Sequence, residues 1–313
     1  VLEELNGLLF YPVQYEGEES SKNVFYTGAA PNQQAIPAVD YYLEELGVKK
    51  FALLGTDYVY PRTTNKILEQ YLKDKGIPAE DIFVNYTPFG HSDWSKIVAD
   101  VVALGADGKK VGVVSTINGD ANIGFYKELA AADVSAEKIP VVAFSVGEEE
   151  LSGLDTSNLV GHLAAWNYFQ SAESDINSEF INAWKNRMGK KRVTNDPMEA
   201  HYIGFNMWVN AVKKAGTTEV DAVRTAMYGQ KFPNLTGGMA EMLTNHHLSK
   251  PVLIGEIKAD GQFDIISQTD PVPGDAWTDF LPESAVLKSD WKNLGCGMYN
   301  TKTKTCVQLK SNY

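Results

Sequence analysis

Residues 35–166 alternate short apolar runs with amphipathic segments. The apolar runs are β-branched and lack a clean in–out alternation, which is typical of parallel strands covered on both faces. We expect these strands at residues 49–55, 81–89, 109–116, 139–146 and 158–166. The intervening segments have helical spacing, and several stop at a glycine. We expect helices at residues 35–47, 65–76, 94–105 and 123–134, with a short helix after residue 147. The pattern predicts a doubly wound α/β unit.

The pattern changes after residue 166, where long amphipathic segments precede a group of short apolar runs. We expect three helices at residues 171–189, 196–216 and 218–229, then strands between 239 and 267 with a hairpin turn at 259–263. These helices need a sheet to cover. The N-terminal "LLFYP" supplies one strand at most, and "LEEL" before it resembles the end of a helix. The sequence therefore predicts an α/β protein whose other lobe lacks its first strands, as in a piece of a longer chain.

Composition limits the classes of function. The 313 residues are 44% hydrophobic and 22% charged, which is typical of a packed protein large enough for two domains. The net charge of −12 and the lack of a basic stripe argue against nucleic-acid and anionic-lipid partners. No apolar run reaches the roughly 18 residues that span a bilayer, so no membrane insertion is expected. The chain also lacks the glycine-rich motifs that cradle phosphates.

The two cysteines, Cys296 and Cys306, flank a polar stretch near the C-terminus. A disulfide is the favoured interpretation and two free thiols the alternative. A disulfide would place the protein in an oxidising compartment such as the periplasm or the cell exterior. Two cysteines are too few for a closed structural zinc site, so we expect no metal there.

Tyrosines follow two of the predicted strands. Tyr11 ends "LLFYP", and "TDYVYPR" places Tyr58 and Tyr60 directly after the strand at 49–55. Ligands of open α/β sheets bind at the carboxyl ends of strands. On an extended segment Tyr58 and Tyr60 would point the same way, so we expect them to wall a small polar pocket. The alternative is that both rings simply pack on the protein surface.

No histidine lies in a convincing catalytic pattern. His246 and His247 are adjacent on a predicted strand, so they face opposite sides, and a hairpin surface is the favoured location. His91, Ser92 and Asp93 are consecutive, whereas a catalytic triad draws on separated segments.

The acidic clusters have a structural explanation as well. Near His201, "NDPME" fits a helix start with Asp196 as N-cap and Glu199 at the third position. The acids at 148–150 begin a helix, where negative charge is favourable. We find no activated nucleophile and no metal-ligand set, so the sequence predicts neither an enzyme nor a cofactor.

Several longer stretches carry a resemblance to a known family. "LLFYPVQYEGEESSKNVFYTGAAPNQQAIP", "GTDYVYPRTTNKILEQYL", "VAFSVGEEEL" and "TNDPMEAHYIGFNMWV" resemble the urea-binding receptors of bacterial urea ABC transporters. The resemblance runs through essentially the whole chain. A weaker one is to cytoplasmic amide-sensing regulators, which share the "YP…YEG" and "DY.YPR" patterns. Both groups have the type I periplasmic binding-protein fold.

The resemblance implies two doubly wound α/β lobes joined by three crossing strands, with the ligand in the cleft between them. It assigns residues 1–27 and 167–252 to lobe 1, and residues 28–166 and 253–313 to lobe 2. The crossings are expected near residues 24–31, 163–170 and 250–260. Further residues before "LEEL" would supply the first strands of lobe 1.

The resemblance also implies a ligand site. Carried over position by position, it falls on Tyr11, Val13, Gln14, Tyr58, Tyr60, Ser145 and Val146. The amide-sensing regulators have a hydroxyl residue where Val13 stands, which leaves its backbone as the group that could contact a ligand. The two tyrosines of "TDYVYPR" would then wall a pocket for a small amide.

The implied function is capture of urea or a short-chain amide outside the cytoplasm, followed by delivery to a membrane ABC permease. The location is periplasmic or extracellular, with tethering through an N-terminal segment that precedes this sequence as one option. A cytoplasmic amide-sensing regulatory protein is the first alternative, and free thiols at Cys296 and Cys306 would favour it. An amidohydrolase is the second, and it would release ammonia from urea.

Overall fold

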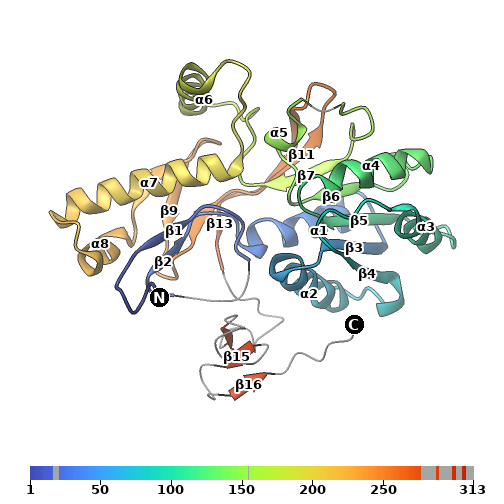
Figure 1. Cartoon of the computed structure of the whole chain (residues 1–313), viewed down its shortest axis with the longest axis horizontal. Helices are drawn as coiled ribbons and strands as arrows, with labels where there is room; N and C mark the ends of the chain where they lie inside the picture. The colour runs from blue at the N-terminus through green and yellow to red at the C-terminus, as the bar shows by residue number, and fades with distance from the viewer. Residues whose placement is uncertain (17–20, 154, 276–286, 289–297, 301–304, 308–313) are drawn as a thin grey trace.

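The computed structural model describes residues 1–16, 21–153, 155–275, 287–288, 298–300 and 305–307. Figure 1 shows the elements gathered in two parts, one around the strands β3 to β7 and the other around the helix α7. None of the described helices is long and apolar enough to cross a membrane. Cys296 lies outside the described residues, and so does the predicted disulfide.

Seven strands form the larger sheet, in the order β12-β11-β7-β6-β5-β3-β4. The strands are β3 (Lys50–Thr56), β4 (Ile82–Thr87), β5 (Val111–Thr116), β6 (Val141–Ala143), β7 (Leu163–Trp166), β11 (Leu253–Ile257) and β12 (Phe263–Gln268). The first five are parallel, which confirms the prediction for this region. The expected hairpin supplies β11 and β12, which join the β7 edge antiparallel.

Helices cover both faces of this sheet. One face carries α1 (Ala35–Glu44) and α2 (Val59–Asp74), and the other carries α3 (Ser95–Leu104) and α4 (Ala121–Ala131). Along β3, Phe51 and Leu53 pack into the core beneath α1 and α2, whereas Ala52 and Leu54 pack beneath α3 and α4. Each fully buried Leu or Phe contributes roughly 1.5–3 kcal/mol. Burial on both faces explains why the sequence shows apolar runs without alternation.

The second part contains two smaller sheets and three helices. The parallel pair is β1 (Leu9–Tyr11) with β2 (Val24–Tyr26), and the antiparallel sheet has the order β13-β10-β9-β8. Its elements are α6 (Asp175–Met188), α7 (Asp196–Ala215), α8 (Val220–Met227), β8 (Lys231–Pro233), β9 (Met239–Met242), β10 (Leu248–Lys250) and β13 (Val272–Pro273). Phe25, Ile203, Met207 and Leu248 belong to its core.

The remaining elements are short. They are the turns η1 (Pro31–Gln33) and η2 (Ala79–Asp81), the helix α5 (Glu148–Leu151), and a three-stranded sheet of β14 (Leu287–Lys288), β15 (Met298–Asn300) and β16 (Thr305–Val307). The expected helix end at "LEEL" is wrong, because residues 2–6 form turns. We name the two main parts the seven-stranded part and the four-stranded part.

The chain passes between the two parts at four places. Three of them follow β2, β7 and β10, close to the predicted positions. The fourth was not expected: after β12 the chain returns to the four-stranded part, where β13 pairs with β10. The proposed assignment of residues 253–313 to lobe 2 therefore does not hold for β13, and the other lobe boundaries stay a proposal.

One local prediction around the tyrosines is wrong. Tyr58 and Tyr60 do not share an extended segment, because α2 begins at Val59 with Tyr58 as its N-cap. Pro61 fits the first helical turn, where a backbone N–H has no intrahelical partner anyway. The two rings nevertheless stay close, with centroids 6.3 Å apart and a tilt of 49° between them.

The expected start of α7 is wrong by one residue. Asn195 is the N-cap, and its side chain accepts a hydrogen bond from the backbone N–H of Met198 at 3.3 Å. Asp196 is therefore the first helical residue, and its carboxylate is free for a different contact. Asp196 and Glu199 are both buried rather than solvated at a helix start.

The expected surface position of the paired histidines is also wrong. The ring of His246 stacks on Phe25 at 4.4 Å between centroids, and that of His247 stacks on Tyr26 at 4.8 Å. Both histidines are buried. They lie on a turn, with His246 at φ 72°, and β2 runs alongside this turn and covers them.

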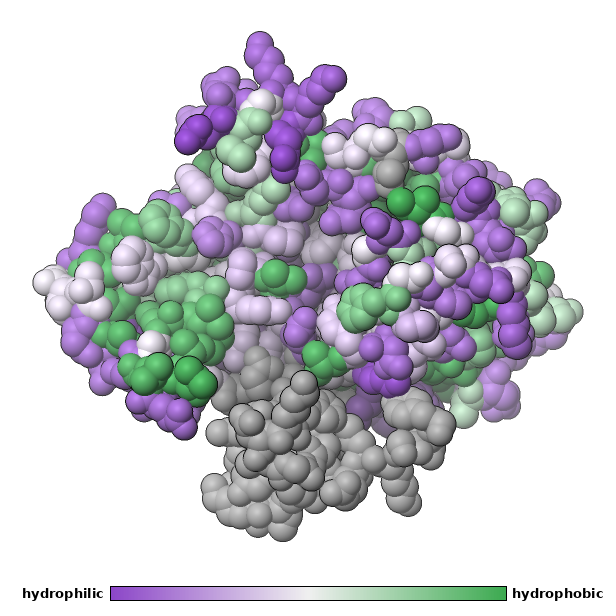
Figure 2. All heavy atoms as spheres, in the orientation of Figure 1, coloured by the Kyte–Doolittle hydropathy of each residue, from purple (hydrophilic) through white to green (hydrophobic). Residues whose placement is uncertain are grey.

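Hydrophobic side chains gather at the end of the molecule where β1, α7 and α8 lie, as Figure 2 shows. Phe205 of α7 is 55% exposed there. Together with Phe10 and Trp208 it lines a groove of about 340 Å³. Another cavity, of about 190 Å³, lies where the two parts meet, and it shares no lining residue with this groove.

Candidate ligand-binding site

A cavity of about 190 Å³ lies where the two parts meet, beyond the ends of β5, β6 and β7. Open α/β sheets place their ligands at this edge. We call it the junction cavity. The seven-stranded part contributes Asn118, Gly119, Ser145, Gly147, Glu148, Glu150 and Trp166, and the other part contributes Val13, Gln14, Asn195, Asp196 and Pro197. Three of the residues predicted for the site, Val13, Gln14 and Ser145, therefore line one cavity.

Gln14 reaches across from the four-stranded part. It follows β1 and is buried, and its side-chain amide donates to the carbonyl oxygen of Phe144. Gln34 also contacts this region: its side-chain amide donates to Phe144 O at 3.2 Å and to Ala165 O at 2.6 Å. Two buried amides thus fix the ends of β6 and β7 beside the cavity.

Tyr60 lies beside this pair of amides. Its hydroxyl donates to Gln34 Oε1 at 3.4 Å, and burial raises the pKa of Tyr60 far above its ordinary value, partly offset by contacts with Gln14 and Ser145. Among the described residues, the enclosed Ser145 hydroxyl finds no hydrogen-bond partner in good geometry. An enclosed hydroxyl without a partner costs roughly 1–3 kcal/mol, so a bound ligand would relieve that cost.

Tyr11 and Tyr58 are brought together from the two parts. Burial raises the pKa of Tyr58 to about 12, and the nearby Glu16 and Tyr11 add to the rise. Burial also raises the pKa of Glu16, and a hydrogen bond with Tyr11 opposes that rise. None of the three tyrosines lines the junction cavity: Tyr60 adjoins it through Gln14 and Ser145, Tyr58 packs against Tyr60, and Tyr11 lies near Tyr58. Glu16 was not among the residues predicted for the site.

The two predicted valines occupy different positions. Val13 lines the junction cavity and is 40% exposed. Val146 is buried, and its carbonyl oxygen accepts a hydrogen bond from Trp166 Nε1 at 2.8 Å. Val146 thus holds the indole that forms part of the cavity wall. Val146 itself lines a neighbouring cavity of about 560 Å³, which shares Gly119 and Glu150 with the junction cavity.

Two buried acids in the cavity wall were not foreseen. Burial raises the pKa of Glu148 to about 8, and its Oε1 accepts from the backbone N–H of Gln170 at 2.5 Å. Burial also raises the pKa of Asp196, whose Oδ2 accepts from the backbone N–H of Asn167 at 2.8 Å. The described residues that line the cavity include no Lys, Arg or His. The wall is therefore unfavourable to anions.

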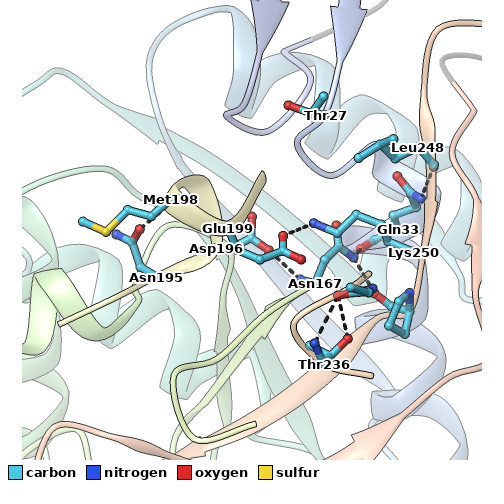
Figure 3. Close-up of polar contacts among 12 residues, drawn as sticks. Thr27, Gln33, Asn167, Asn195, Asp196, Met198, Glu199, Thr236, Leu248 and Lys250 are labelled. Atoms are coloured by element: carbon cyan, nitrogen blue, oxygen red, sulfur yellow. Dashed lines mark hydrogen bonds and ion pairs between the residues drawn. The ribbon is translucent and has the colours of Figure 1, made fainter. Parts of the chain in front are cut away.

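A polar cluster ties the chain crossings together beneath the cavity (Figure 3). The side-chain amide of Asn167 donates to Gln33 O at 2.9 Å and to Pro251 O at 2.8 Å, which joins three of the crossings. Glu199 and Lys250 form an ion pair that is almost fully buried. Burial raises the pKa of Glu199 to about 7, although Lys250 opposes the rise.

The loop "NGDAN" at residues 118–122 contributes to the junction cavity. Within the described part of the chain, no three His, Cys, Asp or Glu side chains group closely enough to hold a metal ion. Asn118 and Gly119 line the junction cavity. Asn122 fixes the loop, because its side-chain amide donates to Ile117 O at 2.9 Å.

Comparison with known proteins identifies the family. The family model described as "Periplasmic binding protein domain" matches residues 1–283. The chain belongs to the periplasmic binding protein domain family. A curated protein named limonene hydroxylase, from Geobacillus stearothermophilus, is 33% identical over 134 residues. That match covers 42% of this chain and 24% of the limonene hydroxylase, so the chain spans about a quarter of that relative.

Solved structures agree with this family assignment. A branched-chain amino acid ABC transporter ligand-binding protein from Burkholderia xenovorans superposes with a TM-score of 0.73 and 16% identity, covering 86% of this chain and 72% of its own. A solute-binding protein of an ABC transporter from Rhodopseudomonas palustris, in complex with p-hydroxybenzoic acid, gives 0.73 and 18%, covering 88% and 75%. At these identities the likeness establishes the periplasmic binding-protein fold, and the ligand has to be argued from the site.

Proposed function

We propose that this protein is an extracytoplasmic substrate-binding protein that captures urea or a short-chain amide and delivers it to the permease of an ABC transporter. The proposal combines the family, the place of the junction cavity and the chemistry of its wall. It assigns binding and transfer to the protein and no chemical step.

The observation that carries the proposal is a small cavity with acceptor-rich walls and no cation. At about 190 Å³ it is smaller than the sites of drug-sized ligands. A carboxylate ligand would find no Lys or Arg among the described wall residues, and Glu150 and Asp196 would repel it. The p-hydroxybenzoic acid held by the Rhodopseudomonas palustris protein is therefore a poor candidate here.

Urea fits the same wall because it is small, planar and neutral. It presents four N–H donors and one carbonyl acceptor, and a dry pocket has to match most of them, since each buried unpaired donor costs roughly 1–3 kcal/mol. Gln14, Asn118 and the acids can accept, and the Ser145 hydroxyl, which also lies beside Tyr60, can donate. Tyr58 and Tyr60 would exclude water at the edge of this site.

The proposed mechanism of capture is closure of two lobes about the chain crossings. The proposed lobes are residues 1–27 with 167–252, and residues 28–166 with most of 253–313. Val13 and Gln14 would approach the ligand from one lobe and Ser145 from the other. Tyr11 would close on Tyr58, which supports counting both in the site.

Calorimetric titration of the protein tests the ligand class. We expect saturable binding of urea, acetamide or formamide, and no binding of 4-hydroxybenzoate or leucine at the same concentrations. The same samples are assayed for ammonia after incubation with urea. Binding of 4-hydroxybenzoate without any amide would contradict the proposed ligand, and steady release of ammonia would contradict a pure binding role.

Removing one tyrosine hydroxyl is expected to weaken amide binding while leaving the fold intact. Tyr58→Phe and Tyr60→Phe keep the aromatic wall, so the loss should be about 1–2 kcal/mol, or roughly 5- to 30-fold in affinity. Titration calorimetry measures the affinity. Thermal unfolding measures the stability of each variant, since urea cannot serve as a denaturant when it is the proposed ligand.

Tyr71→Phe is the matched control for this pair. Its hydroxyl donates to Asp40 on the outer helices α1 and α2, away from the junction cavity. We expect this variant to bind the amide as the original protein does. If Tyr58→Phe and Tyr60→Phe bind normally but unfold at lower temperature, the two tyrosines are core residues and do not belong to the site.

A further inference from the structure

Glu148 occupies an unusual place in the junction cavity. It is the first residue of α5 and lines the cavity, yet only 1% of its surface is exposed. Its polar contacts within the described residues are the backbone N–H groups of Gln170 and of Glu148 itself. No Lys, Arg or His from the described part of the cavity wall faces it. Burial without a cation disfavours the charged carboxylate and raises the pKa of Glu148, although the two backbone N–H contacts oppose the rise.

The charged and titratable groups around Glu148 act in the same direction. Asp196 from α7 and Glu150 from α5 both repel a negative charge on Glu148, and Tyr168 lies beside it at the end of β7. Arg192 approaches the same helix, but it is paired with Glu149 at 3.0 Å. Burial is the largest cause of the rise in the pKa of Glu148 to about 8.

We propose that Glu148 recognises the ligand as a neutral carboxylic acid, with its O–H donating to the carbonyl oxygen and its second oxygen accepting from the adjacent N–H. A carboxylic acid and a primary amide are complementary along one edge, with one donor and one acceptor on each side. This edge is shared by urea, acetamide and formamide and is absent from carboxylates and alcohols. The inference rests on the proposed function and deepens it by naming the group that selects a primary amide.

The first test is the pH dependence of urea or acetamide binding to the unmodified protein, measured by calorimetry between pH 6.5 and 9.5. Only the protonated site is competent, so the apparent affinity should be nearly constant below pH 7 and about tenfold weaker at pH 9. Thermal unfolding at each pH verifies that the protein stays folded. An affinity that stays constant or increases up to pH 9.5 would overturn the proposal.

Glu148→Gln provides the sharper test, because glutamine keeps a donor and an acceptor on the same edge but does not titrate. We expect it to bind the same amide within about threefold at pH 7 and to lose the weakening at pH 9. Glu149→Gln is the matched control, since Glu149 is partly exposed, is paired with Arg192 and does not line the junction cavity. It should keep the original pH profile.

The outcomes separate this inference from the proposed function. If the unmodified protein binds no amide at pH 7, the proposed function fails. If it binds an amide and the binding by Glu148→Gln still weakens at pH 9, another group is responsible for the pH dependence and the role of Glu148 is wrong. If Glu148→Gln does not fold, the pH profile of the unmodified protein still decides, because a flat profile excludes a neutral-acid donor.

Discussion

Gly28→Ala is expected to destabilise the protein by about 3 kcal/mol or more and to abolish amide binding at concentrations that saturate the original protein. A Cβ atom at Gly28 would lie 1.9 Å from Val13 O and 2.8 Å from Pro12 O. These are backbone atoms, so no side-chain rotation can relieve the clash. The displaced segment leads directly to Gln14, whose amide bridges the two parts beside the junction cavity.

Gly7→Ala is the matched control for this change. Its Cβ would meet the flexible end of the Leu2 side chain at 3.2 Å, so we expect little loss of stability and normal binding. Thermal unfolding and calorimetric titration measure both effects. A Gly28→Ala protein that is as stable as the Gly7→Ala protein and binds normally would show that the loop at residues 12–14 can shift freely, which would remove it from the site.

The seven-stranded sheet was predictable because its information is local. Each strand between residues 49 and 166 is a short apolar run followed by an amphipathic helix, and burial on both faces requires that pattern wherever the chain folds. The information that determines the strand order and the fourth crossing is not local. The return of residues 272–273 to β10 depends on a pairing between distant segments, and two residues are too few to leave a signal in the sequence.

The residues of the cavity wall also divide into those that could be predicted from the sequence and those that could not. The resemblance assigned Gln14 and Ser145 to one site, and both line the junction cavity, because they follow strands whose ends meet there. Glu148 and Asp196 were explained as ordinary helix-start residues, and both are indeed at helix starts. Their burial depends on how the two parts meet, and local sequence carries no sign of that contact. A useful signal would have been their position directly beside the ligand edge of the sheet.

The prediction for the two histidines was wrong for a related reason. His246 and His247 follow a strand and precede another, so a solvent-facing hairpin was the natural expectation. Their rings are covered by Phe25 and Tyr26 of β2, more than half the chain away. Burial lowers the pKa of His247 to about 3, so this ring stays neutral across the pH range used in the binding experiments.

A substitution in the buried ion pair of Glu199 and Lys250 beneath the cavity should cause a large loss in the free energy of unfolding. Within the part of the chain that the structure describes, Lys250 is the only positively charged side chain in contact with Glu199, and Lys250→Met removes it. The same lysine also interacts electrostatically with Asp196. Breaking a buried pair by removing one partner typically costs about 3–5 kcal/mol, because an uncompensated charge stays behind. We expect a loss of this size at pH 8, measured by chemical unfolding in guanidinium chloride.

The same prediction has a pH signature with a definite sign. Burial already raises the pKa of Glu199 to about 7, and removal of Lys250 raises it further. The folded protein then binds a proton that the unfolded chain releases above its ordinary pKa near 4.5, so stability falls as the pH rises from there towards 8. The destabilisation by Lys250→Met should therefore be clearly smaller at pH 5 than at pH 8.

Two further variants decide whether the pair itself is responsible. Lys231→Met removes a lysine from the exposed pair with Glu241 and should change stability by no more than about 0.5 kcal/mol. Combining Lys250→Met with Glu199→Leu removes both charges together, and an apolar replacement of a whole buried pair is often neutral. The double variant should regain most of the lost stability. If it is as unstable as Lys250→Met alone, the loss comes from packing rather than from the unpaired carboxylate, and the electrostatic account of this junction is wrong.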